Sequence, residues 1–204
     1  MSEFVVIPKN NNDKVKTIFV DEEPWRDVHC SIFGYQKFEI KSMEQFELLE
    51  QKKVKSFVYK KLAQQNYSSH GLTKILKDFL VPKVLIQAVI QDCQDVGYIN
   101  DEDWLKSFIR GAKAKKNGPR TILQKLLAKG FDKETAALAL ENEDSPKDRV
   151  MRIRKLLETR YKKYDLKDYK EKQKVVGSLL RRGYSFEDIL PCLSLDEFDH
   201  EHYD

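Results

Sequence analysis

An internal repeat constrains the fold of this chain more than any other feature of its sequence. Apolar residues recur three times at offsets of 0, 3, 4, 8, 13 and 17 from a starting position. The three copies are Leu72, Ile75, Leu76, Leu80, Leu85 and Val89; Leu123, Leu126, Leu127, Phe131, Ala136 and Leu140; and Val176, Leu179, Leu180, Tyr184, Ile189 and Leu193. Offsets 0, 3 and 4 form one stripe of a helix, and the later offsets begin a second helix after a turn. The repeat therefore predicts three pairs of short helices.

A further amphipathic segment precedes each pair, so the repeating unit is a module of three helices. These segments are Val54–Leu62, Trp104–Ala112 and Val150–Tyr161. One module buries too little apolar surface to be stable alone, so neighbouring modules must pack end to end. The sequence thus predicts a mainly α fold, an elongated array of three tandem three-helix modules. Within it, Leu76, Leu127 and Leu180 are expected to be equivalent core positions.

The N-terminal part has a different pattern, which predicts a small β element. The β-branched runs Phe4–Ile7 and Val15–Val20 flank the turn-forming KNNNDK and predict a hairpin, and Trp25–Tyr35 is a candidate third strand. So small a sheet needs a helix over one face, and SMEQFELLEQKK supplies it, opened by Ser42 and Gln45 as a capping box. We expect residues 1–52 to form this element, residues 53–99, 100–145 and 146–194 to form modules one, two and three, and residues 195–204 to be an acidic tail.

Charge is distributed unevenly along the chain. The 204 residues carry a formal net charge of +4, yet residues 106–182 alone hold 23 Lys and Arg against 10 Asp and Glu. Such an excess favours an acidic or polyanionic partner for the second and third modules, although a lysine-rich solvated face would also explain it. Charge alone does not decide between the two interpretations.

Cellular location and chemistry are constrained by what the sequence lacks. No apolar run approaches the roughly 18 residues that cross a bilayer, and the first residues do not resemble a signal peptide, so we expect a cytoplasmic protein with no membrane partner. Cys30, Cys93 and Cys192 are far apart and without metal-ligand spacing, which indicates buried thiols. No catalytic motif connects the four histidines, and the tail motif His200-Glu201-His202 lacks further ligands. We therefore expect no enzymatic activity, no metal and no cofactor.

The stretch GYINDEDWLKSFIRGAKAKKNGPRTILQKLLAKGFD, residues 97–132, resembles the central signature of the regulatory protein RecX family. In that signature a Gly-Tyr-acidic turn, a helix ending in Arg, a basic loop and Gly-Pro follow in this order. KEKQKVVGSLLRRGYSFEDILPCL is similar to the family's third module and KSFVYKKLAQQNYSSHGLTKIL to its first, so the resemblance covers residues 54–193. The family's usual arginine-rich run in the first module is replaced here by YSSHGLTKIL, so no basic contact carries over to that module.

The resemblance implies a non-enzymatic regulator of the recombinase RecA. Such a protein binds in the groove of the RecA filament and inhibits recombinase and coprotease activity, and thereby modulates DNA recombination, DNA repair and the SOS response. We expect it to act as a monomer and to bind bare single- or double-stranded DNA only weakly.

The candidate partner-binding residues are cations of the second and third modules. Several lie in the loop before Gly118-Pro119, beside a helix N-terminus whose dipole adds to the positive potential. Others are expected on the side of their helix that faces away from Val150 and Ile153, or just before the Gly183 turn. The predicted stripe consists of Lys113, Lys115, Lys116, Arg120, Arg149, Arg152, Lys155, Arg181 and Arg182.

The alternative function is a direct nucleic-acid-binding helical-repeat protein that uses the same cations on phosphates. Single-strand binders also need aromatic side chains on which bases stack. Most aromatic residues of the modules fall on apolar stripes, which leaves Tyr161, Tyr164 and Tyr169 in RYKKYDLKDYKEK, a segment expected to be an exposed connection.

Overall fold

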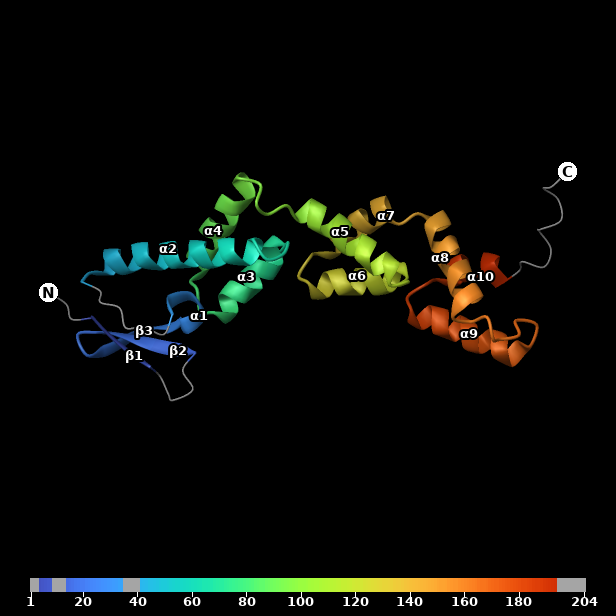
Figure 1. Cartoon of the computed structure of the whole chain (residues 1–204), viewed down its shortest axis with the longest axis horizontal. Coiled ribbons are helices and arrows are strands. Elements are labelled where there is room, and N and C mark those ends of the chain that lie inside the picture. The colour runs from blue at the N-terminus through green and yellow to red at the C-terminus, as the bar shows by residue number, and fades with distance from the viewer. Residues whose placement is uncertain (1–3, 9–13, 35–40, 194–204) are drawn as a thin grey trace. The chain divides into compact units, whose positions relative to one another are not determined.

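The computed structural model describes residues 4–8, 14–34 and 41–193, and the chain divides into two compact units, Met1–Asp101 and Glu102–Asp204. Helices dominate both units (Figure 1), so the expected mainly α fold class is confirmed. No helix within the described ranges has the length and apolar character needed to cross a membrane. The acidic tail with its two histidines, and most of the KNNNDK turn, lie outside the described residues.

The first unit begins with a three-stranded antiparallel sheet. Its strands β1 (Phe4–Pro8), β2 (Val15–Val20) and β3 (Glu23–His29) pair in the order β1-β2-β3. The expected hairpin is therefore present, and so is a third strand. That strand starts earlier than Trp25 and ends at His29, because the short helix α1 (Cys30–Phe33) follows at once with the His29 side chain accepting a hydrogen bond from the backbone N–H of Ser31.

One long helix, α2 (Met43–Leu62), covers this sheet. The Ser42 hydroxyl accepts the backbone N–H of Gln45, so the predicted helix start is confirmed. The Phe46 ring meets Trp25 edge-on with ring centroids 5.1 Å apart, and it stacks on Phe33 at 5.6 Å. The helix continues without interruption through the expected segment boundary between residues 52 and 53, so Val54–Leu62 is its second half rather than a separate helix.

Helices α3 (Ser69–Asp78) and α4 (Lys83–Asp95) complete the first unit. The sheet and the helices share a single apolar core, in which Val28 of β3, Val58 of α2 and Leu72 of α3 are buried. The His29 ring stacks on Phe79, with centroids 4.3 Å apart, and so joins the sheet to the end of α3. Burial lowers the pKa of His29, with Lys14 adding to the effect, so the ring is neutral at physiological pH.

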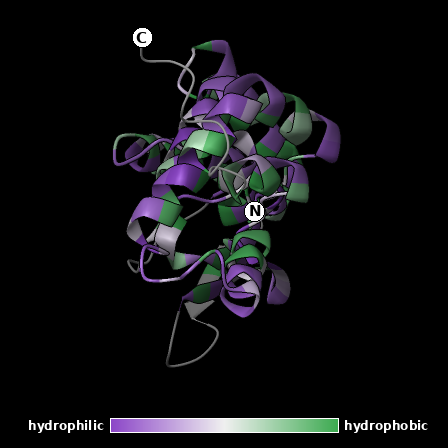
Figure 2. Cartoon of the chain, turned by 90° about the vertical axis from the view of Figure 1, so that its right-hand side faces the viewer, coloured by the Kyte–Doolittle hydropathy of each residue, from purple (hydrophilic) through white to green (hydrophobic). Residues whose placement is uncertain are grey.

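Within its described residues, the second unit contains six helices in two groups of three. They are α5 (Asp101–Ala114), α6 (Pro119–Ala128), α7 (Lys133–Glu143), α8 (Pro146–Thr159), α9 (Tyr169–Arg181) and α10 (Phe186–Leu193). The first three surround one apolar cluster and the last three surround another. Along single helices, hydrophobic and hydrophilic residues alternate in bands, as an inward-facing stripe requires (Figure 2). The module boundaries expected between residues 99 and 100 and between residues 145 and 146 stay predictions.

The same turn joins α3 to α4, α6 to α7, and α9 to α10. Its central residue has positive φ in each case: Leu80 at 62°, Gly130 at 99° and Gly183 at 90°. The next residue donates its N–H to the carbonyl five positions earlier, as in Val81 to Leu76 at 3.0 Å. This is a Schellman motif, in which a left-handed residue closes the helix and an apolar contact accompanies the hydrogen bond.

The position of this turn shows which residues of the three copies are equivalent, and these equivalences differ from the predicted ones. The residues that fill equivalent buried positions are Leu72, Leu76, Val81 and Ile86 in the first copy, Ile122, Leu126, Phe131 and Ala136 in the second, and Val175, Leu179, Tyr184 and Ile189 in the third. The predicted equivalence of Leu80 with Phe131 is wrong by one position, because Leu80 is apolar yet occupies the left-handed position of the turn, and Val81 is the buried residue. The expected core role of Leu127 is also wrong, since its side chain is 40% exposed and Leu126 is buried instead.

Adjacent leucines of α6 therefore provide a matched test of the register. Leu126→Ala should lower the free energy of unfolding by roughly 2 to 5 kcal/mol, because it leaves a cavity in the core. Leu127→Ala should change it by about 0.5 kcal/mol or less, as exposed positions do. Urea denaturation followed by far-UV circular dichroism measures both, and equal losses for the two variants would refute the corrected register.

The left-handed leucine gives a second test. An L side chain at positive φ costs about 1–2 kcal/mol, and glycine removes that cost. Leu80→Gly should therefore raise the stability of the first unit by about 0.5–1 kcal/mol, some of the gain being offset by the greater freedom of glycine in the unfolded chain. Gly130→Leu, the reciprocal change, should destabilise. A fall in the melting temperature of Leu80→Gly would contradict this account.

Candidate partner-binding surface of the second unit

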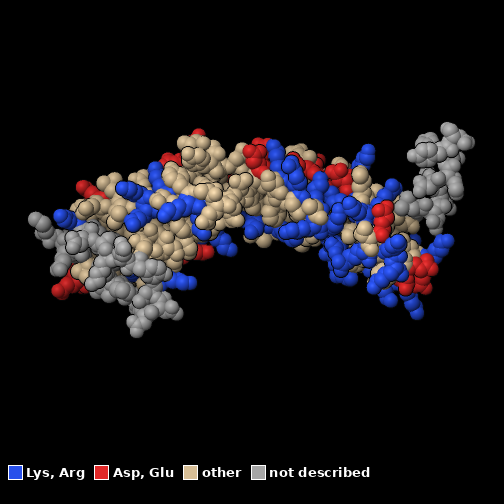
Figure 3. Space-filling view, viewed as in Figure 1, with Lys and Arg blue, Asp and Glu red and all other residues tan. Residues whose placement is uncertain are grey.

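All nine predicted cations belong to the second unit, where Lys and Arg gather over much of the face in view (Figure 3). They come from the end of α5, the loop before α6, the start of α6, helix α8, and the end of α9. The structure separates them into cations that hold the unit together and cations that remain available to a partner.

Arg152 belongs to the first group. Its guanidinium donates two hydrogen bonds to the Asp144 carboxylate, Nη1 to Oδ1 at 2.7 Å and Nη2 to Oδ2 at 2.9 Å. It also lies 6.0 Å from the centre of the Tyr184 ring. Burial opposes the charge on Arg152, but the interactions with Asp144 and Tyr184 together outweigh it and raise the pKa of the guanidinium. The expectation that Arg152 lies on an exposed helix face is wrong, because only 8% of the residue is accessible.

Lys113 also contacts Asp144 and the residues around it. The Lys113 ammonium donates to the backbone carbonyl of Glu143, forms an ion pair with Asp148 at 3.0 Å, and lies 3.7 Å from the Asp144 carboxylate. These contacts join the end of α5 to the end of α7 and the start of α8. Lys113 is thus a structural residue of the second unit.

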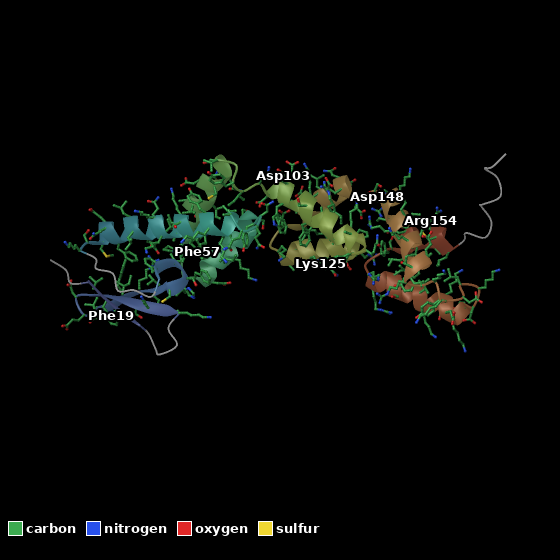
Figure 4. The ribbon with its side chains drawn as sticks, viewed as in Figure 1. Phe19, Phe57, Asp103, Lys125, Asp148 and Arg154 are labelled. Carbon is green, nitrogen blue, oxygen red and sulfur yellow. The ribbon has the colours of Figure 1, made fainter. Side chains whose placement is uncertain are left out.

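Arg149 extends these contacts to α10. Its Nε donates to Asp188 Oδ1 at 2.8 Å, and its Nη1 donates to the backbone carbonyl of Asp144 at 2.8 Å. Burial opposes ionisation of Asp188, but hydrogen bonds from Arg149 and Ser185 lower the pKa of this carboxyl below its usual value. We call Lys113, Asp144, Asp148, Arg149, Arg152 and Asp188 the Asp144 cluster; Figure 4 labels Asp148 on α8.

A close backbone contact brings the remaining cations together. The Gly118 N–H donates to the Arg182 carbonyl at 2.7 Å, and the Arg120 N–H donates to the Gly183 carbonyl at 3.1 Å. A Cβ on Gly118 would lie 2.3 Å from the Gly183 carbonyl carbon, and a Cβ on Gly183 would lie 2.4 Å from the Thr121 nitrogen. The loop before α6 therefore docks on the turn between α9 and α10, and only glycine fits on either side.

Tyr184 reinforces this docking. Its ring is fully buried, and its hydroxyl donates to the backbone carbonyl of Lys116 at 3.2 Å. Lys116 itself has positive φ, 58°, at the end of α5. The sequence analysis gave Gly118 only the role of starting α6, which the structure confirms, with Gly118 as N-cap and Pro119 in the first turn. It did not detect the contact with Gly183.

The contact brings together two segments that carry five cations, which we call the junction cations: Lys115, Lys116, Arg120, Arg181 and Arg182. Lys115, Arg120 and Arg181 are exposed, and the other two are half-buried. Within the described ranges none of the five has an acidic partner, so their charges add to a positive surface that attracts anions. Lys155, the ninth predicted residue, is exposed on α8, and no contact joins it to this group.

A second group of cations lies beside α9, and only its member Arg181 was predicted from the sequence. Arg160, Lys163, Lys174 and Arg181 line a pocket of about 460 Å³ beside α9. Lys174 and Arg181 are seven positions apart, a spacing that places both on one face of a helix. This spacing could have revealed the pair from the sequence. Tyr161 and Tyr164 also line the pocket. Tyr161 is buried apart from this contact, and its hydroxyl lies 2.7 Å from that of Ser178. The segment expected to be an exposed connection thus contributes a core residue.

Evidence for metal or thiol chemistry is lacking in the part of the chain that the structure describes. It contains no group of three His, Cys, Asp or Glu side chains that could hold a metal ion. Cys30, Cys93 and Cys192 are buried thiols, as expected. Burial raises the pKa of Cys93 and of Cys192, so both stay protonated.

Both a family model and curated proteins match this chain in sequence. The family model described as "RecX, third three-helix domain" matches residues 148–193, which contain nearly all of α8 to α10. The regulatory protein RecX of Vibrio campbellii is 35% identical over 114 residues, which are 56% of this chain and 72% of that protein. The chain belongs to the RecX family.

Solved RecX structures share the fold. A crystal structure of RecX from Lactobacillus salivarius matches with a TM-score of 0.62 at 25% identity, covering 70% of this chain and 94% of that one. A crystal structure titled as a regulatory protein RecX matches with the same TM-score at 20% identity, covering 94% and 98%. The succession of three-helix groups is therefore a RecX arrangement.

The Asp144 cluster can be tested by removing its central carboxylate. Asp144→Ala should lower the free energy of unfolding by about 3–5 kcal/mol, because it leaves the buried Arg152 charge uncompensated. Asp148→Ala, which removes an exposed partner of Lys113, should cost much less. Thermal and urea unfolding of the two variants provides the comparison, and a loss for Asp144→Ala no larger than that for Asp148→Ala would contradict the role given to the cluster.

Proposed function

We propose that this protein regulates RecA by binding the RecA filament and inhibiting its recombinase and coprotease activities, and so modulates DNA repair, recombination and the SOS response. Membership of the RecX family supports this proposal, as does the name of the matched relatives, regulatory protein RecX. The protein does so without catalysing a reaction.

One observation carries the proposal: the junction cations form a concentrated positive surface that the fold does not neutralise. Their acidic neighbours are engaged elsewhere. Asp144 and Asp188 bind Arg152 and Arg149, and Asp148 binds Lys113. These three carboxylates are thus occupied by other cations, which leaves Lys115, Lys116 and Arg120 available to the acidic or phosphate groups of a nucleoprotein filament.

The backbone contact also holds these cations in place before any partner arrives. Gly118 and Arg120 are hydrogen-bonded to Arg182 and Gly183, so cations from two distant segments keep a fixed spacing. A preorganised charged surface loses less conformational entropy on binding than one carried on a flexible loop. This is the physical advantage that the glycine pair gives to a filament-binding protein.

Charge reversal at the junction tests the proposal. Lys116→Glu, Arg120→Glu and Arg182→Glu together should raise the concentration needed for half-inhibition of RecA by about tenfold or more, since they replace attraction by repulsion. Lys133→Glu, Lys147→Glu and Lys170→Glu reverse three exposed charges away from the junction and serve as the control. Inhibition is measured by RecA-driven ATP hydrolysis and strand exchange on single-stranded DNA, and circular dichroism checks the fold.

Arg152 is left unchanged in this design because its replacement would unpair Asp144 and destabilise the unit. Full inhibition by the junction variant, or no inhibition by the wild-type protein, would refute the proposal.

Direct binding of nucleic acid is the second candidate function, and the pocket beside α9 favours it. Four cations line that pocket together with Tyr164, a combination that suits phosphates and a stacked base. The same experiment separates the candidates when binding to naked and RecA-coated single-stranded DNA is compared at one ionic strength. Equal affinity for both, falling steeply with salt, together with unchanged RecA activity, would favour the nucleic-acid binder.

A further inference from the structure

A groove between α5 and α6 has no role in the architecture described so far. Its volume is about 420 Å³, which is within the range of about 300–1,000 Å³ typical of ligand-binding pockets. The floor is made of small and apolar residues, Phe108, Gly111, Ala112 and Ala128. The rim is polar and carries only positive charge. This division into an apolar floor and a cationic rim is the basis of the inference.

Gly111 is the most informative residue of the floor. It lies inside α5, where glycine weakens a helix relative to alanine. Neither backbone conformation nor packing requires it, because it is helical and a Cβ at this position would meet no atom within 4 Å. A side chain here would project into the groove. The glycine therefore keeps the groove open at a cost in helix stability.

The rim consists of Lys115, Lys125, Lys129 and Asn117. Within the described residues, none of the three lysines forms an ion pair; Figure 4 labels Lys125 on α6. The Asn117 side-chain nitrogen Nδ2 is buried and has no hydrogen-bond partner there. A buried donor without an acceptor is unfavourable, so the groove wall gains from an occupant that supplies oxygen atoms.

Asn117 is held in the wall by the end of α5. Its backbone N–H donates to the Ala112 carbonyl at 3.2 Å, in a turn whose central residue, Lys116, has positive φ. The amide is thus fixed beside the floor, and a rotation of its side chain presents the donor to an occupant. Three ammonium groups and an amide together form a site for an oxyanion.

A carboxylate suits this site better than the phosphate of a nucleic acid does. A single strand would need an exposed aromatic face for its bases, but Phe108 stacks on Trp104 with ring centroids 5.0 Å apart and an interplanar angle of 18°. The apolar floor instead accepts an aliphatic side chain next to the acid. Lysine, with three donors that rotate freely, binds a carboxylate in many orientations.

We propose that this groove binds an acidic residue of a protein partner, presented in a short peptide segment whose neighbouring apolar side chain lies over Gly111. The site is distinct from the Gly118–Gly183 contact and shares only Lys115 with the junction cations. The proposal does not depend on RecA being the partner, and its test contains no RecA, so its failure and that of the proposed function are distinguishable.

The test uses the full chain, labelled with ¹⁵N, and the peptide acetyl-Ala-Leu-Glu-Leu-Ala-amide. Saturable shifts are expected for the backbone amide of Gly111 and the side-chain amide of Asn117. The peptide with Gln in place of Glu, which lacks the charge, should bind about tenfold more weakly or not at all. Equal binding of the two peptides, or no shift at millimolar peptide, would overturn the proposal.

Variants at the floor and rim make the test specific. Gly111→Ala should preserve binding and stabilise α5, whereas Gly111→Leu should keep the fold and abolish binding because it fills the groove. Lys125→Gln with Lys129→Gln should weaken binding by about tenfold, and Lys133→Gln, outside the groove, should not. Unchanged affinity in Gly111→Leu, or tighter binding of oligo-dT at the same resonances, would show that the groove is not a carboxylate site.

Discussion

The buried carboxylate of Asp144 is the interaction on which the second unit depends. It lies where α7 ends and α8 is about to begin, and it meets a guanidinium from α8 and an ammonium from α5. Taking a charge out of water is unfavourable, so the carboxylate is stable only while its cations remain in place. Of these cations, Lys113 belongs to α5, whose end leads directly to Lys115 and Lys116 of the junction. The exposed basic surface therefore depends on a buried acidic group.

Much of this organisation can be read from the sequence, because it depends on local periodicity. The helical repeat, the cap at Ser42, the start of α6 at Gly118-Pro119 and the mainly α fold all follow from residues close in the chain. The register failed at Leu80, where an apolar residue occupies a left-handed position that glycine fills in the other two copies. Apolar pattern alone cannot distinguish a core residue from a turn residue of the same type.

The candidate site was less predictable, since its charges are sorted by partners distant in sequence. Arg149 meets Asp188, and Lys113 meets Asp148, across 39 and 35 positions respectively. Residue spacing along one helix does not reveal such pairs. The sequence alone therefore does not distinguish cations held in internal ion pairs from cations available to a partner. The same holds for Tyr161, which lies in a charged run yet is buried against α9. The family resemblance suggests a function, but only the packing shows which arginines are available for binding a partner.

The Gly118–Gly183 contact has a consequence for how this sequence can vary. Each glycine leaves room for backbone on the other side, so a substitution at either position separates the same two surfaces. Once Gly118 has been replaced, replacing Gly183 adds the cost of a side chain at positive φ but no second separation of the backbones, and restoring one glycine alone does not restore the contact. The two positions lie far apart in the chain, yet we expect them to retain glycine, or to lose it, together in evolution.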